Sequence, residues 1–217
     1  MIIDAANQVP PVENLHRFID IGADLVCFSG GKGIRGPQSS GILCGRKKLI
    51  ASAALQMLDM AGQAFGEWDP PASLIPKEKL RGCPQHGIGR AMKVSKEAII
   101  GLLVALENLT EESFKEKSDY LRGLLKTIEK RLESVAGLEM KVIPDPNSAY
   151  PVLELKLNEE VIKKSAYEVV RRMREGEPRI YLRGRYLHQG RIFIFPLNLD
   201  EELSKILAER LYESLTA

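Results

Sequence analysis

One glycine-rich segment contains the side chains with the clearest chemical potential. It runs from Ser29 to Pro37, includes Lys32, and follows a short apolar run at Leu25 to Phe28. A lysine in such a turn after a strand is typical of phosphate binding, and its amine can also form a covalent bond with a carbonyl compound. Asp4 adds a carboxylate directly after a second apolar run near the start of the chain. The chemistry indicated is phosphate recognition or covalent catalysis through an amine.

Two known phosphate-binding loops share features with this segment but do not fit it. A Walker A loop places Ser or Thr directly after its lysine to hold magnesium, and Gly33 stands there. The glycines at 31, 33 and 36 match G-x-G-x-x-G, but that fingerprint opens a helix and needs an acid about 20 residues later. Here Pro37 and another apolar run follow, and position 51 is Ala51. The match to the dinucleotide fingerprint is accidental.

Pyridoxal 5'-phosphate (PLP) is a cofactor whose needs these residues meet. It requires a lysine for a Schiff base, a carboxylate that keeps the pyridine nitrogen protonated, and hydroxyl or backbone N–H donors for its phosphate. Lys32, Asp4 and Ser29 have these types, and Ala6 is small enough to lie flat against a ring. Because α/β sheets bind ligands at the carboxyl ends of their strands, we expect Asp4 and Lys32 to converge there. The competing interpretation is a turn that only holds a solvated lysine.

The elements that position these residues follow from the apolar pattern of the first 58 residues. This pattern predicts the order strand, helix, strand, turn, strand, helix. The expected helices are Glu13 to Ile19 and Lys47 to Leu58, and the strands after the first are Leu25 to Phe28 and Ser40 to Gly45. This order is typical of part of an α/β sheet.

Residues 60–93 are rich in glycine and proline, which excludes regular structure over most of the segment. Loops of this length in compact domains are usually lids or linkers, so this loop is a candidate wall of an active site. From Val94 the pattern becomes helical, and two helices reaching about Val135 would link two domains.

The remainder predicts a small α+β domain, with helices packed on a mostly antiparallel sheet. Its expected strands are Leu138 to Ile143, Pro151 to Leu157, Arg179 to Arg183 and Arg191 to Phe195. A turn is expected at Pro144 to Asn147, and helices at Glu159 to Arg174 and from Asp200, the expected N-cap, to Leu215.

Composition and charge argue against several functional classes. The 31 basic and 29 acidic side chains are interleaved and leave a net charge of +2, without the basic cluster typical of nucleic-acid or membrane-surface binding. The longest apolar stretch, Ala98 to Leu106, is shorter than the roughly 18 residues that span a bilayer. Three cysteines without a C-x-x-C pair favour a reducing cytoplasm, and no His/Cys cluster indicates a metal.

Three segments together resemble the fold-type I PLP enzymes. They are Asp4 to Pro11, Asp24 to Gly41 and His86 to Val94. The group that they resemble most is selenocysteine synthase (L-seryl-tRNA(Sec) selenium transferase) and its relative D-glucosaminate-6-phosphate ammonia-lyase. The resemblance implies that Lys32 is the Schiff-base lysine and Asp4 the pyridinium partner, with PLP as the cofactor.

The resemblance also implies a domain organisation, in an α/β fold similar to that of aspartate aminotransferase. Residues 1–93 would be the C-terminal part of the PLP-binding large domain, residues 94–136 the linking helices, and residues 137–217 the small α+β domain. Ser29 would be a phosphate contact. Family members begin with an earlier segment that contains a glycine-rich phosphate loop and a residue stacked on the cofactor. The chain therefore resembles the C-terminal portion of a longer enzyme.

One departure from the family bears on the reaction. Selenocysteine synthases have an acid directly before the lysine, whereas Gly31 stands there in this chain. This difference favours lyase-like relatives over transfer of selenium on a tRNA, so nucleic acid is expected only for a true selenium transferase.

The resemblance implies α,β-elimination or β-replacement on an amino acid or an amino sugar phosphate. Lys32, once displaced by the substrate amine, would be the general base. Arginines suit substrate carboxylates or phosphates, and Arg90 is the first candidate, with Arg183 and Arg191 as second candidates. His86 could assist proton transfer, although each of these side chains could equally be an ordinary surface residue.

The resemblance to fold-type I enzymes implies an active site at the interface of a dimer, so a homodimer or larger homo-oligomer is expected. The alternative function is a non-catalytic remnant or subunit that dimerises and needs a missing N-terminal half to bind cofactor. A start inside the large domain would leave apolar strand faces uncovered, which predicts a chain that associates or aggregates.

Overall fold

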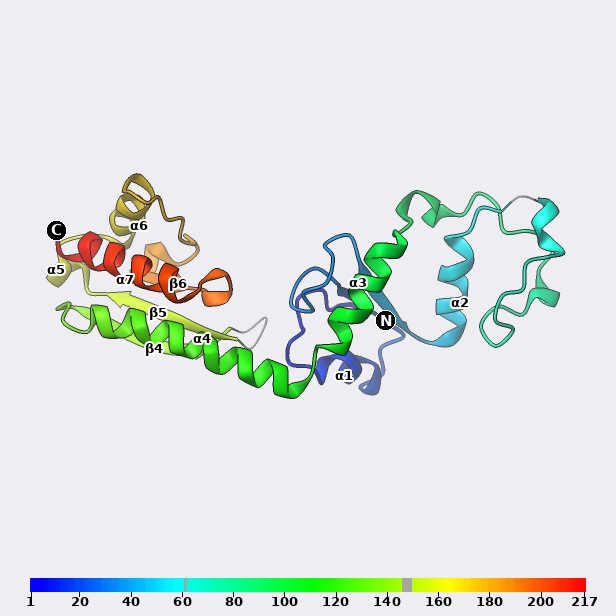
Figure 1. Cartoon of the computed structure of the whole chain (residues 1–217), viewed down its shortest axis with the longest axis horizontal. Helices are drawn as coiled ribbons and strands as arrows, with labels where there is room; N and C mark the ends of the chain where they lie inside the picture. Colours follow the sequence, from blue (N-terminus) through cyan, green and yellow to red (C-terminus); the bar gives the residue numbers. More distant parts are fainter. Residues whose placement is uncertain (61, 146–149) are drawn as a thin grey trace. The chain divides into compact units, whose positions relative to one another are not determined.

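The computed structural model describes residues 1–60, 62–145 and 150–217 (Figure 1). They divide into two compact units, Met1–Glu111 and Glu112–Ala217, and each unit has its own hydrophobic core and its own sheet. The α/β fold class expected from the sequence is confirmed. The turn expected at Pro144 to Asn147 lies partly outside the described residues.

The first unit contains a three-stranded sheet in the order β1-β2-β3. Its strands are β1 (Ile2–Asp4), β2 (Leu25–Ser29) and β3 (Gly41–Gly45), and α1 (Asn14–Asp20) lies between β1 and β2 in the chain. β1 pairs with β2 in parallel, and β3 pairs with β2 antiparallel. The predicted order of elements is therefore confirmed, up to α2 (Lys47–Gln56).

The segment predicted to be a long irregular loop contains three short 3-10 helices. They are η1 (Gly62–Phe65), η2 (Lys77–Lys79) and η3 (Ile88–Met92). Within the described part of this segment there is no α-helix or strand, as its glycine and proline content predicts. Helix α3 (Lys96–Glu107) then begins at the N-cap Ser95, whose side chain accepts a hydrogen bond from the Ala98 amide.

The second unit packs helices on an antiparallel sheet with the order β4-β5-β6. Its elements are α4 (Glu111–Leu132), β4 (Leu138–Pro144), β5 (Pro151–Leu157), α5 (Glu159–Ile162), α6 (Ala166–Glu175), η4 (Leu187–Gln189), β6 (Arg191–Ile194), η5 (Pro196–Asn198) and α7 (Glu201–Thr216). Leu153 and Leu155 of the central strand are fully buried in a core that includes Leu125 of α4, Met173 of α6 and Leu211 of α7.

Two predicted elements of the second unit were wrong. The helix expected from Glu159 to Arg174 is divided, because Lys163 adopts a left-handed conformation that ends α5, and Ser165 then caps α6. The strand expected from Arg179 to Arg183 makes only one bridge, between Arg183 and Phe193. Its apolar side chains, Ile180 and Leu182, pack on the core without forming a ladder.

The expected N-cap of α7 is confirmed, and it provides a test of the second unit. The Asp200 carboxylate accepts a hydrogen bond from the Leu203 amide at 2.8 Å. We expect Asp200→Ala to lower the free energy of unfolding by about 1 kcal/mol, because one N-terminal amide of the helix loses its acceptor. Asp200→Asn keeps an acceptor and is the control. Urea unfolding monitored by far-UV circular dichroism measures the difference. Equal midpoints for the two variants would contradict a stabilising role of the cap.

Candidate active site

The parallel pairing of β1 with β2 places two candidate residues at one edge of the sheet. Asp4 lies opposite Cys27, and the Ala5 amide continues the ladder by donating to the Cys27 carbonyl at 2.9 Å. Both strands therefore end at the same side of the sheet, with Asp4 at the end of one and Ser29 at the end of the other. This is the edge at which α/β sheets bind their ligands.

Asp4 is held in an orientation set by the backbone that follows it. One carboxylate oxygen accepts a hydrogen bond from the Ala6 amide at 2.9 Å, and the side chain is exposed. Ala6, in the loop after β1, is half-buried. The position leaves a carboxylate facing solvent beside a small apolar side chain.

The turn that contains Lys32 is closed by its own hydrogen bonds. The Arg35 amide donates to the Lys32 carbonyl at 2.9 Å, and the Gly36 amide donates to the Gly30 carbonyl at 2.7 Å. The Gln38 side-chain amide adds a bond to the Gly31 carbonyl at 2.8 Å. The backbone of Lys32 is therefore fixed, while its side chain is exposed.

Close packing ties this turn to the loop that follows Asp4. A Cβ atom on Gly33 would lie 1.6 Å from the Val9 carbonyl oxygen, so only glycine fits there. On another side, Leu102 of α3 packs against the turn, because a Cβ on Gly30 or Gly36 would lie 3.0 or 3.3 Å from its methyl carbon. The sequence-predicted residues Asp4, Ala6, Ser29 and Lys32 thus belong to one packed region of the first unit.

The residues present fit part of the PLP molecule. An exposed carboxylate ends β1 at Asp4 and an exposed lysine follows β2 at Lys32, the residue types that the ring nitrogen and the aldehyde carbon of PLP need. The phosphate has fewer donors here, because the Gly30 amide is bonded to the Ser40 carbonyl and the Gly36 amide to the Gly30 carbonyl. Of the residues expected to bind the cofactor, Ser29 is the one that offers a hydroxyl group for the phosphate. The site therefore matches the reactive end of the cofactor better than its phosphate.

His86 and Arg90 are brought together by Asp59, a residue that the sequence analysis did not select. Arg90 forms an ion pair with Asp59 at 2.7 Å (Nε to Oδ2), and the His86 amide donates to the other carboxylate oxygen at 3.0 Å. The His86 amide is the main cause that lowers the pKa of Asp59, with Arg90 adding to it and partial burial opposing it. Arg90 is therefore already paired with an acid. The ion pair ties η3 to the segment that directly follows α2.

Arg183 and Arg191 lie together in the second unit, in a pocket of about 260 Å³. Its lining also includes Arg185, Tyr186, Phe193 and Phe195, none of which the sequence analysis selected. Their common signal, arginines at 183, 185 and 191 near aromatic residues at 186, 193 and 195, becomes meaningful only once the strands are paired.

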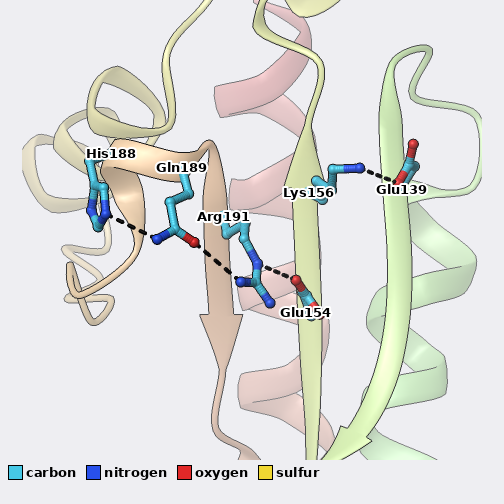
Figure 2. A network of polar contacts seen from close by, with 6 residues as sticks. All are labelled: Glu139, Glu154, Lys156, His188, Gln189 and Arg191. Atoms are coloured by element: carbon cyan, nitrogen blue, oxygen red, sulfur yellow. Dashed lines mark hydrogen bonds and ion pairs between the residues drawn. The ribbon is translucent and has the colours of Figure 1, made fainter.

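Arg191 is the most constrained of these arginines. It forms an ion pair with Glu154 of β5 and donates to the Gln189 side chain at 3.3 Å, as Figure 2 shows. His188 lies beyond Gln189 in the same network, at 3.1 Å between the two side-chain nitrogens. The hydrogen bond to Glu154 raises the pKa of Arg191. Arg183, in contrast, lies over the Phe195 ring at 4.2 Å.

Two broader features of the described residues concern membranes and metals. None of their helices is long and apolar enough to cross a membrane. In the same residues, no group of three or more His, Cys, Asp or Glu side chains could hold a metal ion.

Comparison with known proteins finds relatives that are enzymes. It is 30% identical over 217 residues to 5'-C-glycyluridine monooxygenase-decarboxylase of a Streptomyces species, and 28% identical over 214 residues to D-glucosaminate-6-phosphate ammonia lyase of Salmonella typhimurium. It is 29% identical over 186 residues to L-seryl-tRNA(Sec) selenium transferase of Aquifex aeolicus. These alignments cover 99, 98 and 78% of this chain but 46, 48 and 34% of the relatives. No family model matches the chain.

A solved structure of D-glucosaminate-6-phosphate ammonia-lyase superposes on 99% of this chain, with a TM-score of 0.61 and 27% sequence identity. The match covers 48% of that enzyme, so the chain spans about half the length of the relatives that it matches. The fold is that of part of a fold-type I PLP enzyme, and the relatives and structural neighbours depend on this cofactor. Within this class the chain is homologous to D-glucosaminate-6-phosphate ammonia lyase and selenocysteine synthase, which confirms the resemblance seen in the sequence.

The close approach at Gly33 provides a test of the packed region. We expect Gly33→Ala to lower the free energy of unfolding by about 1–3 kcal/mol, because its methyl group would overlap the Val9 carbonyl. Gly66→Ala is the control, since an added Cβ there meets nothing within 4 Å. Thermal unfolding monitored by the fluorescence of Trp68, which lies in the same unit, separates the two. Equal midpoints for the two variants would contradict the described contact.

The ion pair of Asp59 gives a second test. We expect Asp59→Asn to increase the rate of trypsin cleavage after Arg90 several-fold, because the loop loses its anchor on the carboxylate. Asp69→Asn changes an exposed acid of the same loop and is the control. Mass spectrometry of the fragments gives the rates, and equal cleavage of both variants would exclude an anchoring role for Asp59.

The pH dependence of the same loop follows from the lowered pKa of Asp59. Because the folded-state pKa is depressed, the stabilisation is complete above the unfolded-state value of about 3.9 and is lost as pH falls through the lower folded-state value. We therefore expect the amide resonance of His86 to move only below about pH 4. A transition of that resonance near neutral pH would show that another group controls the loop.

Proposed function

We propose that this chain supplies the reactive lysine and the pyridinium partner of a PLP-dependent enzyme. Lys32 is the lysine that binds the cofactor, and Asp4 is the carboxylate that pairs with the ring nitrogen. The observation that supports this most directly is their common position at the carboxyl edge of the β1–β2 pair, with the Lys32 turn packed through Gly33 on the loop after Asp4.

PLP, when bound, supplies an electron sink for the negative charge that develops as a proton leaves the Cα atom of an amine substrate. In this proposal the Asp4 carboxylate holds a proton on the pyridine nitrogen, which keeps the ring electron-poor. The Ala6 methyl group would pack against the ring, and the Ser29 hydroxyl would donate to the phosphate. With a substrate amine bound, the Nζ atom of Lys32 would be the base that takes the proton from Cα.

The reaction proposed first is α,β-elimination on an amino acid or an amino sugar phosphate. The similarity to D-glucosaminate-6-phosphate ammonia lyase supports it, as does Gly31 in place of the acid expected of a selenium transferase. β-Replacement is the second candidate, supported by the similarity to a selenium transferase. The name of the Streptomyces relative describes an oxygenation and a decarboxylation, a reaction type that was not expected from the sequence. All three are enzymes, so an enzymatic role is the common expectation.

Arg90, His86, Arg183 and Arg191 remain proposals as substrate contacts. Two of them are paired with acids, Arg90 with Asp59 and Arg191 with Glu154, so each can bind a substrate anion only in competition with that acid. Arg183 meets an aromatic ring instead, which leaves its charge to attract a substrate phosphate or carboxylate. We therefore rank Arg183 first, whereas the sequence alone favoured Arg90.

The same proposal includes association with a second copy of the chain. Helix α3 buries Ala98 and Leu102 and packs Ala105 and Leu106 partly against the core, but four further apolar side chains, Ile99, Ile100, Leu103 and Val104, are 49–61% exposed. A helix that is apolar all round is normally buried, and a contiguous exposed patch marks an interface. This face supports the alternative in which the chain works only in association, including with a polypeptide equivalent to the remaining half of its relatives.

Absorbance tests the role of the two cofactor residues. We expect the chain with PLP to develop a band at about 410–430 nm, and we expect Lys32→Ala to abolish it because the amine is removed. Lys48→Ala removes an exposed lysine elsewhere in the first unit and is the control. Asp4→Ala should weaken cofactor binding about tenfold or more and shift the band, since the ring nitrogen loses its partner. An equal band in the Lys32 and Lys48 variants would exclude Lys32.

The exposed face of α3 is tested by two charges. We expect the unmodified chain to sediment as a dimer or larger species, and Ile100→Lys with Leu103→Lys to shift it toward the monomer, because the interface would then bury ammonium groups. Leu203→Lys changes a single exposed leucine of α7 and is the control. A stable monomer for the unmodified chain in analytical ultracentrifugation would contradict self-association. Recovery of a complex only with the first half of the ammonia lyase would assign the face to that partner instead.

A further inference from the structure

The pocket of the second unit is built on the face of the sheet that turns away from the core. Along β6, Ile192 and Ile194 point into the core, so Arg191 and Phe193 point to the opposite face. Glu154, which lies opposite Phe193 on β5, joins them there through its ion pair with Arg191. The opposite face of a small sheet is usually polar and solvated, whereas here it forms a lined cavity of about 260 Å³.

The lining of this pocket combines positive charge with aromatic rings. Tyr186 and Phe193 contact each other with ring centroids 5.2 Å apart and an interplanar angle of 56°. The bridge between Arg183 and Phe193 brings the segment after α6 alongside β6, which places Arg183 and Arg185 at the same cavity. Ile143 and Val152 complete an apolar wall, and Asp145 also borders the cavity.

The three arginines of the pocket differ in whether each is already paired with an acid. Arg191 is paired with Glu154 and also contacts Gln189. Arg183 and Arg185 are exposed and lie over rings, at 4.2 Å from Phe195 and 5.5 Å from Tyr186 respectively. Among the residues that the structure describes, neither of these two arginines forms an ion pair. Their charges are therefore available to an anion, while Arg191 maintains the shape of the pocket.

We propose that this pocket binds a single planar ring that carries a phosphate or carboxylate group. Arg183 and Arg185 hold the anionic group, since guanidinium groups match phosphate and carboxylate geometry. The ring packs against Tyr186 and Phe193, whose faces prefer offset or edge-to-face contact with another aromatic group. The volume of about 260 Å³ is below the roughly 300 Å³ at which pockets for drug-sized ligands begin, so one ring with its substituent fills it.

This inference rests on the proposed function in one respect, because Arg183 is also ranked there as a substrate contact, but its test does not use the chemistry at Lys32. The pocket lies entirely within the second unit, and its lining residues run from Ile143 to Phe195. Binding there can be measured without cofactor and without turnover. A failed test of Lys32 would leave ligand binding in this pocket measurable, whereas a failed binding test would remove Arg183 as the first-ranked substrate contact and leave the role of Lys32 unaffected.

Calorimetric titration of the full chain, without PLP, tests the site with four probes. Phenyl phosphate and benzoate each combine a ring with an anion, whereas phenol lacks the charge and inorganic phosphate lacks the ring. We expect at least one of the first two to bind at least tenfold more tightly than phenol and inorganic phosphate. Stronger binding of phenyl phosphate would identify phosphate as the preferred anion, and stronger binding of benzoate would identify carboxylate. Binding of neither ring compound at millimolar concentration would overturn the proposal.

Variants locate the binding. We expect Arg183→Gln and Arg185→Gln each to weaken binding about tenfold, the scale of one charge-assisted hydrogen bond of about 1.4 kcal/mol. Arg183→Lys keeps the charge and should retain most of the affinity, which separates loss of charge from loss of folding. Arg174→Gln removes an exposed arginine of α6 outside the pocket and should change nothing. Affinity that survives the double Arg183/Arg185 variant, or that disappears in Lys32→Ala, would place the ligand elsewhere and refute the site.

Discussion

The parallel register between β1 and β2 is the constraint on which the candidate active site depends. It sets Asp4 opposite Cys27, so the carboxylate and the turn that contains Lys32 emerge at the same edge of the sheet. Because side chains alternate along a strand, a slip of one residue would turn Asp4 to the other face. Gly33 and Leu102 then fix the turn from two sides, one through the Val9 carbonyl and the other from α3. Lys32 thus has a fixed backbone and an exposed side chain, as the proposed role of a Schiff-base lysine would require.

Ion pairs decide which of the candidate arginines are available to bind a substrate anion. Arg90 and Arg191 are both held by acids that are distant in sequence, Asp59 and Glu154, and both pairs shape a local structure. The arginines that remain available, Arg183 and Arg185, lie among aromatic rings. Charge count alone does not identify a substrate contact, because an arginine that is already paired must lose its partner before it can bind a second anion.

The sequence was sufficient for the elements whose signals are local. The bounds of β5, the Asp200 cap and the order of the first unit follow from alternation, capping chemistry and turn residues. It failed where tertiary contacts decide. The helix ends at Lys163 in a left-handed conformation, although no glycine there predicts it. Ile180 and Leu182 have the alternation of a strand, but they pack on the core and their segment makes only one bridge to β6. The pocket and the Asp59 anchor were missed because their residues meet only after distant strands and loops are paired.

The proposed function depends above all on Lys32 as the residue that binds PLP. Reduction with borohydride after incubation with the cofactor, followed by peptide mapping, tests it most directly, since reduction fixes the cofactor to whichever lysine holds it. We expect label concentrated on the peptide that contains Lys32, with Lys47 and Lys48 nearly unlabelled. Label spread evenly over surface lysines, or concentrated on another lysine, would contradict it.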